Sequence, residues 1–383
     1  MPPTPMTTIV PPAFEWPLQF CAFVTVTTYV LSIVTSNVSQ VDRLWTFLPT
    51  IYTAYYALLP ILPKAHEQPF PLYPYVPASL EKLAEEWNPR AVMMLGLVTI
   101  WMFRLSYNTY RRGLFSLKDE DYRWAVLRTQ LNPFLFQVTN LTFIAITQNI
   151  LLFLMGIPAY IAVSQAPEPL ATSDYALGAL ALMLIATEFT SDNQQYSYQS
   201  FKAAHLKGGQ YDAADHWPGA RLEWTAADAQ RGFITRGLFA YSRHPNFACE
   251  QLFWWTINFI PILSPSAPSD IKLNYSITEC LEWFKNPTFS ADLSNPATWS
   301  IFLLLLPATC YSILFFSSTP YTESITTKKY PGYKDYQRRV GMFSPFGTIE
   351  KSIWLSITEG STGKKAIEDR VWGDSVKGKG KAE

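Results

Sequence analysis

The stretch Tyr241-Ser242-Arg243-His244-Pro245-Asn246-Phe247 brings an arginine, a histidine and an amide to the mouth of an apolar run that continues through Trp254 and Trp255. Polar groups are rare in membrane segments, since a charge at the bilayer centre costs about 2.5 kcal/mol or more. The cluster therefore indicates a ligand site at one end of a membrane helix. Pro245 fits the first turn of that helix, where its missing N–H removes no hydrogen bond.

The composition of the whole chain indicates a polytopic membrane protein. Of 383 residues, 49% are hydrophobic, 15% aromatic and only 16% charged, whereas a soluble domain carries roughly 25% charged residues. The 13 Trp and 21 Tyr residues suit the membrane interfaces, where amphipathic rings gather. The 30 basic residues balance the 30 acidic ones, so we expect no field that would attract nucleic acid.

Seven apolar stretches are long enough, or nearly so, for a helix across a ~30 Å hydrocarbon core, which takes about 20 residues. We therefore predict an all-α polytopic membrane bundle of about seven transmembrane helices with a polar cofactor cavity open to the cytosol. The predicted spans lie near residues 17–35, 44–62, 91–110, 133–158, 174–192, 246–263 and 298–317. The predicted organisation is a disordered lead-in (1–16), a single membrane domain (17–346) and a polar cytosolic tail (347–383), disordered after residue 357.

Loop charges predict the orientation of this bundle. Of the 30 basic residues, 24 lie in alternate loops, namely 36–43, 111–130, 193–245 and the tail from 318. Because basic loops stay cytoplasmic, the C-terminus is predicted to be cytosolic and the Asn274-Tyr275-Ser276 sequon lumenal. The final residues, Lys379-Gly380-Lys381-Ala382-Glu383, fit a K-x-K-x-x retrieval signal and so favour the endoplasmic reticulum membrane, although a merely basic tail would look the same.

Four polar side chains follow one another at the end of the fifth predicted span. Glu188, Asp192, Gln195 and Gln199 are spaced so that they share one helical face. Two acids and two amides in one stripe suit hydrogen bonding to the hydroxyls and amide of a nucleotide. The alternative is a solvated helix end.

The sixth span begins with a second polar group. Arg243 and His244 lie beside the backbone N–H groups of a predicted helix N-terminus, which is a natural phosphate site. Asn246 and Glu250, four residues apart, share the inner face of that helix. A structural role for His244 is the alternative.

Two further segments have open interpretations. Arg104, inside the third span, either extends its side chain to the membrane interface, or pairs with Glu188 or Asp192, or contacts an anionic cofactor. Residues 321–336, which include Glu323 and several tyrosines, form either a membrane-facing amphipathic segment or a lid over a cofactor.

The common nucleotide and metal motifs are missing from the sequence. There is no G-x-G-x-x-G after a strand, no G-x-x-x-x-G-K-[ST] and no H-E-x-x-H. The four cysteines are far apart and lack zinc spacing, so we predict no metal site. A nucleotide would have to be held by helix ends and by side chains within the bundle.

Taken together, these segments resemble the membrane proteins that share the steroid 5-alpha-reductase C-terminal domain, and above all their largely uncharacterised branch. The matching pieces run in consistent order from about residue 40 to about residue 346. They are Val41-Asp42-Arg43-Leu44-Trp45 with Pro49, Trp101-x-x-Arg104-Leu105, Glu120-Asp121-Tyr122-Arg123, Asp192-x-Gln194-Gln195, Ser242-Arg243-His244-Pro245-Asn246-Phe247-x-x-Glu250, and Tyr330-Pro331-x-Tyr333-x-x-Tyr336.

The resemblance implies a seven-helix fold, NADPH as cofactor, and reduction of a carbon–carbon double bond conjugated to a carbonyl in a sterol, steroid or other lipid. By motif, the family's cofactor contacts fall on Arg104, Asp192, Asn246 and Glu250. Tyr241 matches a tyrosine that precedes the sixth span. The expected partners are a lipid or sterol-like substrate and the bilayer, with no obligate protein partner.

One departure from the family concerns the proton donor. The steroid reductases carry a catalytic Glu just before a Leu-Pro pair, where this chain has Phe47. A phenol, with a pKa near ~10, is then the favoured donor to an enolate. Tyr52 and Tyr56 share a helical face and are the favoured catalytic candidates, with interfacial belt residues as the alternative. Asp42, Tyr55 and Tyr107 are the other candidate donors, although Asp42 more simply pairs with Arg43 or caps a helix.

Two other classes of protein stay open. Isoprenylcysteine-type membrane methyltransferases carry an Arg-His-Pro-x-Tyr-like element that would contact S-adenosylmethionine. Phe247 in place of that tyrosine, the downstream Glu250 and the glutamine-rich stripe favour the reductase. A non-catalytic member that keeps the cofactor fold is the third class, since the family Glu is absent.

Overall fold

The computed structural model describes residues 12–267 and 296–373, and every helix or strand assigned within these ranges is a helix. The predicted all-α class is therefore confirmed for this part of the chain. The chain divides into two compact units. Unit 1 comprises Met1–Leu182 and Trp254–Tyr311, and unit 2 comprises Met183–Phe253 and Ser312–Glu383. The Asn274 sequon, Cys280 and the terminal Lys379–Glu383 signal lie outside the described residues.

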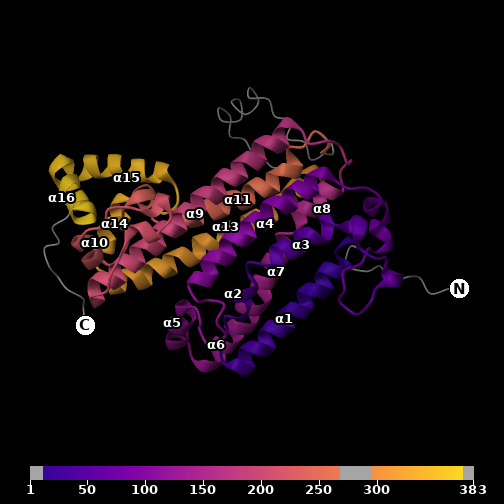
Figure 1. Cartoon of the computed structure of the whole chain (residues 1–383), viewed down its shortest axis with the longest axis horizontal. Coiled ribbons are helices and arrows are strands. Elements are labelled where there is room, and N and C mark those ends of the chain that lie inside the picture. The colour runs from indigo at the N-terminus through magenta and orange to yellow at the C-terminus, as the bar shows by residue number, and fades with distance from the viewer. Residues whose placement is uncertain (1–11, 268–295, 374–383) are drawn as a thin grey trace. The chain divides into compact units, whose positions relative to one another are not determined.

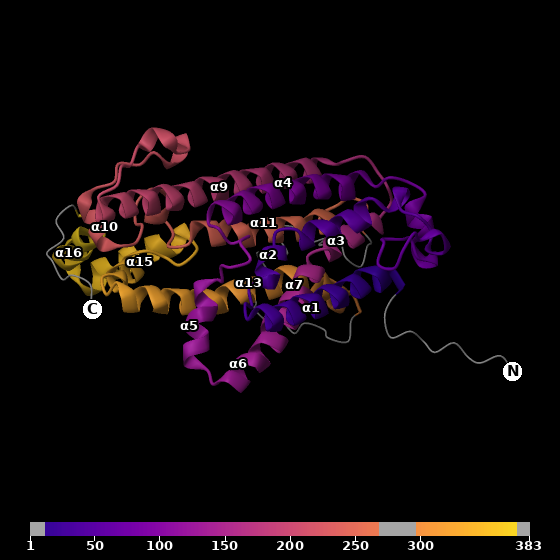
Figure 2. The same ribbon diagram turned by 60° about the horizontal axis from the view of Figure 1, so that its bottom comes forward.

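Unit 1 consists of long helices joined by short helical turns (Figure 1). Its helices are η1 (Pro12–Phe14), α1 (Glu15–Thr35), α2 (Gln40–Leu44), α3 (Leu48–Ala57), η2 (Leu59–Ile61), η3 (Ala65–Glu67), η4 (Ala78–Ala84), α4 (Pro89–Arg111), α5 (Tyr122–Gln130), α6 (Pro133–Thr139), the π-helical η5 (Asn140–Thr147), α7 (Gln148–Leu154) and α8 (Ile157–Val163). Figure 2 shows α5 and α6 as a short hairpin. Three long helices, α9 (Thr172–Lys207), α11 (Pro245–Ile262) and α13 (Pro296–Lys329), contribute to both units.

Unit 2 adds shorter helices to its parts of α9, α11 and α13. These are η6 (Ala213–Asp215), η7 (Pro218–Ala220), α10 (Ala226–Arg231), η8 (Gly237–Ala240), α14 (Tyr333–Arg339), α15 (Pro345–Thr358) and α16 (Gly360–Trp372). Leu355, Ile367 and Val371 from the last two helices are buried in one apolar cluster with Phe233 and Tyr336. The predicted boundary at residue 346 and the predicted disorder after 357 are therefore wrong for residues up to 372, because periodic apolar residues dock both helices onto α14.

Three helical segments are long and apolar enough to cross a bilayer, among the residues that the structure describes: Pro12–Val34, Pro89–Arg111 and Pro133–Val163. Apolar side chains such as Phe23, Val34 and Phe103 are exposed on them, as expected where lipid rather than water is the solvent. This arrangement indicates a membrane-embedded protein.

The remaining predicted spans map onto helices of other lengths. The stretch near 44–62 contains α3, which has 10 residues and is about 15 Å long at 1.5 Å per residue. The stretch near 174–192 is part of the 36-residue α9. The segment near 133–158 is interrupted between α7 and α8 at Gly156, where a side chain would meet Cβ of Tyr52 at 2.5 Å. Close packing of α3 therefore requires glycine here.

A buried ion pair joins two helices of unit 1. Nε and Nη2 of Arg90 donate to the Asp174 carboxylate at 2.8 and 3.0 Å, and both side chains are almost fully buried. The amide of Gln165 accepts a bond from Arg90 at 3.3 Å and donates to the Pro261 carbonyl at 2.7 Å. The sequence reading placed Arg90 in a loop, whereas it lies in the first turn of α4.

Candidate functional site

Asp192 and Asn246, two residues predicted to contact a cofactor, meet in unit 2. Asn246 Nδ2 donates to Asp192 Oδ1 over 3.2 Å. Asp192 is buried in α9, and half-buried Asn246 is the second residue of α11. The start of α11 is held in place because the N–H groups of Arg243 and His244 donate to the carbonyls of Gly341 and Met342 at 2.9 and 3.0 Å. The result is a buried acid–amide pair at a helix N-terminus.

The other predicted residues of these two helices extend the same polar surface. Because α9 is one continuous helix, Glu188, Asp192, Gln195 and Gln199 do share a face. Along it, Glu188 is buried, Gln195 is half-buried and Gln199 is exposed. Glu250, one turn beyond Asn246 in α11, is buried. The stripe therefore runs from the interior of the protein to its surface.

Gln194, part of the Asp192-x-Gln194-Gln195 motif but not one of the predicted site residues, makes two polar contacts. Its amide donates to the Gly219 carbonyl at 2.9 Å and accepts the N–H of Leu238 at 2.9 Å. Gly237 has φ +64°, and a Cβ there would lie 2.5 Å from Gln194 Oε1. Gln194 thus fixes the loop before α11, while Tyr241 at the end of that loop has an exposed side chain.

Glu323 is the centre of a second buried polar cluster in unit 2. Arg243 donates from Nε and Nη2 to the two carboxylate oxygens at 2.7 and 3.0 Å. His244 Nε2 lies 2.8 Å from Oε1, Tyr333 donates to Oε1 at 3.1 Å, and Gln337 donates to Oε2 at 2.8 Å. Burial by itself raises the pKa of the Glu323 carboxyl, but the bonds from His244 and Arg243 hold that pKa well below its usual range.

This cluster changes the interpretation of Arg243 and His244. The sequence reading favoured both as phosphate contacts, whereas their side chains bind Glu323, and Arg243 also donates to the carbonyls of Gln337 and Val340. The geometry gives them the structural role of fixing the start of α11. Such a partner is hard to find from sequence, because Glu323 is about 80 residues away from both.

The tyrosines after α13 are neither a lid nor a membrane-facing segment. Tyr333 and Tyr336 are buried beside Phe233. The Tyr336 hydroxyl donates to the Phe239 carbonyl at 2.5 Å. Both interpretations offered for residues 321–336 are therefore corrected at these two positions, because the rings form the core of unit 2.

The two catalytic candidates in unit 1 have different surroundings. The Tyr56 hydroxyl donates a hydrogen bond to the Ala13 carbonyl at 3.2 Å, so its proton is held in a structural hydrogen bond. Tyr52 is fully buried between the rings of Phe20 and Phe153. Its hydroxyl lies beside the Cys21 thiol, a weak hydrogen-bond partner, and meets no stronger donor or acceptor among the described residues. Of the pair, Tyr52 is the better placed to donate a proton to a bound molecule.

Thr46 and Thr50 lie one turn apart at the start of α3, and the sequence reading did not single them out. Helical threonines commonly bond back to the carbonyl four residues earlier, as Thr28 does to Val24 at 2.8 Å. The hydroxyls of Thr46 and Thr50 are buried and make no hydrogen bond within the described part of the chain.

Arg104 is buried in α4 of unit 1, one turn after Trp101, whose ring packs edge-on against Trp254 at 5.0 Å. The prediction that Arg104 contacts an anionic cofactor stays a prediction.

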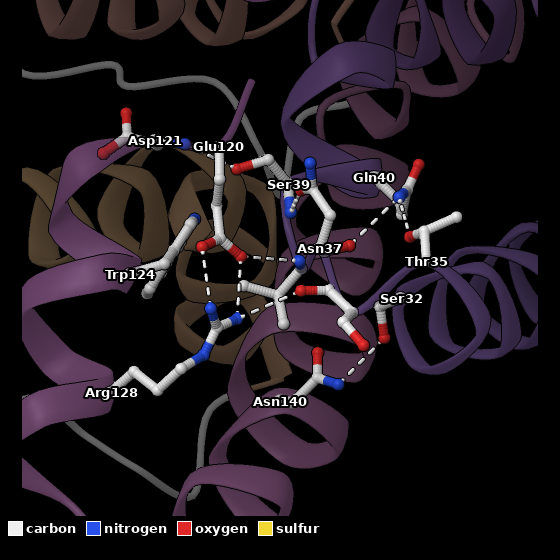
Figure 3. Close-up of polar contacts among 12 residues, drawn as sticks. Ser32, Thr35, Asn37, Ser39, Gln40, Glu120, Asp121, Trp124, Arg128 and Asn140 are labelled. Atoms are coloured by element: carbon white, nitrogen blue, oxygen red, sulfur yellow. Dashed lines mark hydrogen bonds and ion pairs between the residues drawn. The ribbon is translucent and has the colours of Figure 1, made fainter. Parts of the chain in front are cut away.

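Two motif pieces from the sequence, residues 41–45 and 120–123, belong to neighbouring segments of unit 1, because Arg43 donates to the carbonyls of Ser116 and Asp119 at 2.8 and 2.7 Å. Figure 3 shows the adjoining polar network, which includes Ser39, Gln40, Glu120 and Asp121. Glu120 accepts the Val38 N–H at 2.9 Å and also binds Arg128 at 2.9 Å. Figure 3 shows the pair of Glu120 and Arg128. Trp124 Nε1 donates to Asp42 at 2.9 Å. The expectation that Asp42 pairs with Arg43 or caps a helix is thus replaced by a hydrogen bond between helices α2 and α5.

Comparison with known proteins places the chain among others of undetermined role. A family model described as a protein of unknown function (DUF1295) matches residues 28–268. An uncharacterized protein of Schizosaccharomyces pombe is 29% identical over 336 residues, which cover 85% of this chain and 76% of the yeast protein. No solved structure matches the chain.

Proposed function

The chain belongs to the DUF1295 family of proteins of unknown function, and from that premise we propose that it is an NADPH-dependent membrane reductase. Its proposed substrate is a sterol, steroid or other lipid in which a carbon–carbon double bond is conjugated to a carbonyl. The observation that carries the proposal is the buried Asp192–Asn246 pair at the start of α11. The sequence resemblance to the steroid 5-alpha-reductase C-terminal domain supports the same activity.

The residues of this site fit the sugar and nicotinamide parts of the cofactor. Carboxylates of Asp192 and Glu250 accept hydrogen bonds from hydroxyls and amides, and the amide of Gln195 both donates and accepts. The donation from Asn246 Nδ2 to Asp192 sets the orientation of that side chain, so its Oδ1 is the atom turned to an incoming N–H. Arg243 is not offered as the phosphate contact, since Glu323 holds its guanidinium.

NADPH, when bound, supplies the hydride for the reduction. Asp192 keeps the Asn246 amide in one orientation, and the burial of Asp192 strengthens its hydrogen bonds by excluding water. From the sequence resemblance, Tyr52 is the proposed proton donor, because the hydroxyl of a phenol can donate to the oxygen of a developing enolate.

The proposed setting is the endoplasmic reticulum membrane, with seven spans and the site open to the cytosol. The concentration of basic residues in alternate loops supports this orientation, because such loops stay on the cytoplasmic side. The C-terminus is then cytosolic.

The test is ligand-induced stabilisation of the purified full-length protein. We expect NADPH to raise the unfolding temperature and S-adenosylmethionine to leave it unchanged, since a ligand at 100 times its Kd adds about 2.7 kcal/mol of stability. Asp192→Asn should lose the shift, whereas Asp369→Asn, a change at an exposed aspartate of α16, should keep it. A shift with S-adenosylmethionine alone would favour the methyltransferase, and no shift with either ligand would favour a non-catalytic protein.

A further inference from the structure

Helix α15 is fixed firmly to unit 2 by one of its faces. Thr348 Oγ1 accepts the Gly341 N–H at 2.8 Å and donates to the Tyr241 carbonyl at 2.6 Å. Lys351 donates to the Val340 carbonyl at 3.2 Å, and Leu355 is buried in the apolar cluster of the unit. These positions recur with helical spacing, so they determine which side of α15 faces outward.

The outward side of α15 is largely apolar, with the exposed Glu350 as a single charged residue among large apolar side chains. Its large side chains are each between 56% and 74% exposed, and their spacing of three, seven, eight and eleven residues from the first places them on one stripe. They are Phe346, Ile349, Ile353, Trp354 and Ile357. A contiguous apolar face of this kind on a folded surface marks an interaction site.

The apolar surface of α13 leads directly to this stripe. Ile313 and Phe316, one turn apart in α13, are 61% and 59% exposed. The Phe316 ring packs edge-on against Phe343 at 4.9 Å, and Ser344, the next residue, caps the N-terminus of α15. The outward face of α15 therefore continues the exposed face of α13.

The sequence of α13 shows where this continuous surface leaves the hydrocarbon. No charged residue occurs from Thr298 to Thr322, and charges begin at Glu323. Phe316 thus lies close to the end of the predicted last span, at the depth where headgroups begin. A helix that starts beside it, with its inner face docked onto the protein and a largely apolar outer face, suits the plane of the membrane interface. Trp354 in the stripe is a residue type that favours that region.

We propose that α15 is an interfacial helix whose apolar stripe rests on the cytosolic leaflet of the bilayer. The inference rests on the proposed assignment of α13 as the last span. Through the bonds from Thr348 to Tyr241 and Gly341, lipid contact by α15 also anchors the loop that begins α11. The start of the proposed cofactor site is in this way held at a defined depth relative to the lipid surface.

Spin-label accessibility in the full-length protein in lipid nanodiscs tests this proposal. The described native cysteines are buried or half-buried and would be replaced to give a clean background. Labels at Ile353→Cys and Ile357→Cys should collide several-fold more with oxygen than with a water-soluble nickel complex. Labels at Lys365→Cys and Asp369→Cys, two exposed positions of α16, should show the opposite preference.

Each alternative occupant gives a distinct result. Nickel preference at all four positions would overturn the proposal, and so would spin–spin broadening at Ile353→Cys, which would indicate a second copy of the chain. If the spin labels disturb folding, the quenching of tryptophan fluorescence by brominated phospholipids tests lipid contact without a label. Trp354→Phe should lower that quenching relative to the unsubstituted protein, and unchanged quenching would contradict lipid contact. Neither experiment measures NADPH binding, so a negative result would contradict the interfacial position of α15 without contradicting the proposed function.

Discussion

Replacing Glu323 by glutamine should destabilise the protein strongly, because it removes the charge that balances a buried guanidinium. The carboxylate receives two bonds from Arg243 and one each from Tyr333 and Gln337, and it lies 2.8 Å from His244 Nε2. Glutamine keeps the shape but offers only one acceptor oxygen. Removing one partner of a buried ion pair costs about 3–5 kcal/mol, since the other charge stays buried.

The same cluster predicts how stability depends on pH. The pKa of Glu323 is lower in the folded protein than in the unfolded chain, where it is about 4.3. Its stabilising contribution is therefore fully present above that unfolded value. This contribution is lost progressively as the pH falls through the pKa of the unfolded chain toward the pKa of the folded protein. The Glu323→Gln variant should lack this acid-dependent loss.

The assay is equilibrium unfolding of the full-length protein in detergent, followed by tryptophan fluorescence. Glu350→Gln, a change at an exposed glutamate of α15, is the matched control and should change stability by less than about 0.5 kcal/mol. A double substitution, Arg243→Met with Glu323→Leu, should cost less than Glu323→Gln alone, because it leaves no unpaired charge. Equal stability of Glu323→Gln and Glu350→Gln would refute the reasoning.

Two further substitutions probe the proton donor and the backbone. Tyr52→Phe should lower turnover and leave NADPH-induced stabilisation intact. Tyr56→Phe should instead keep turnover, and it should lose about 1 kcal/mol of stability because the hydrogen bond to the Ala13 carbonyl is removed. Full activity of the Tyr52→Phe variant would show that Tyr52 is not the proton donor. Gly232→Ala should lower the unfolding temperature, because φ is +88° and the new Cβ would lie 2.2 Å from the Tyr330 ring; an unchanged unfolding temperature would show that this ring can move aside.

Helix content and the polar stripe of α9 could be predicted from the sequence because both depend on local periodicity. Asp192 and Asn246 were singled out from separate motifs, and they are hydrogen-bonded in unit 2. Both residues could be identified from the sequence without knowledge of their tertiary contact. A carboxylate and an amide at the ends of apolar helices need polar partners, which marks them as candidates.

The errors came from long-range pairing. Arg243 and His244 resembled a phosphate site because their local setting, a helix start after a loop, is the same in both roles. Only the fold reveals that Glu323 supplies the anion. The sequence predicts a polar tail from residue 347 because the apolar Leu355, Ile367 and Val371 are few and scattered. Their burial depends on α14, which no local pattern identifies as a partner.

The most direct test of the proposed activity follows a labelled hydride. Purified protein is incubated with a lipid extract from cells that lack it and with NADPH deuterated at the transferable position of the nicotinamide. The account predicts that deuterium appears in a lipid that gains two hydrogens at a double bond, and that Asp192→Asn abolishes the transfer while Asp369→Asn retains it. Deuterium that stays on the cofactor in the presence of the complete lipid extract would contradict the account.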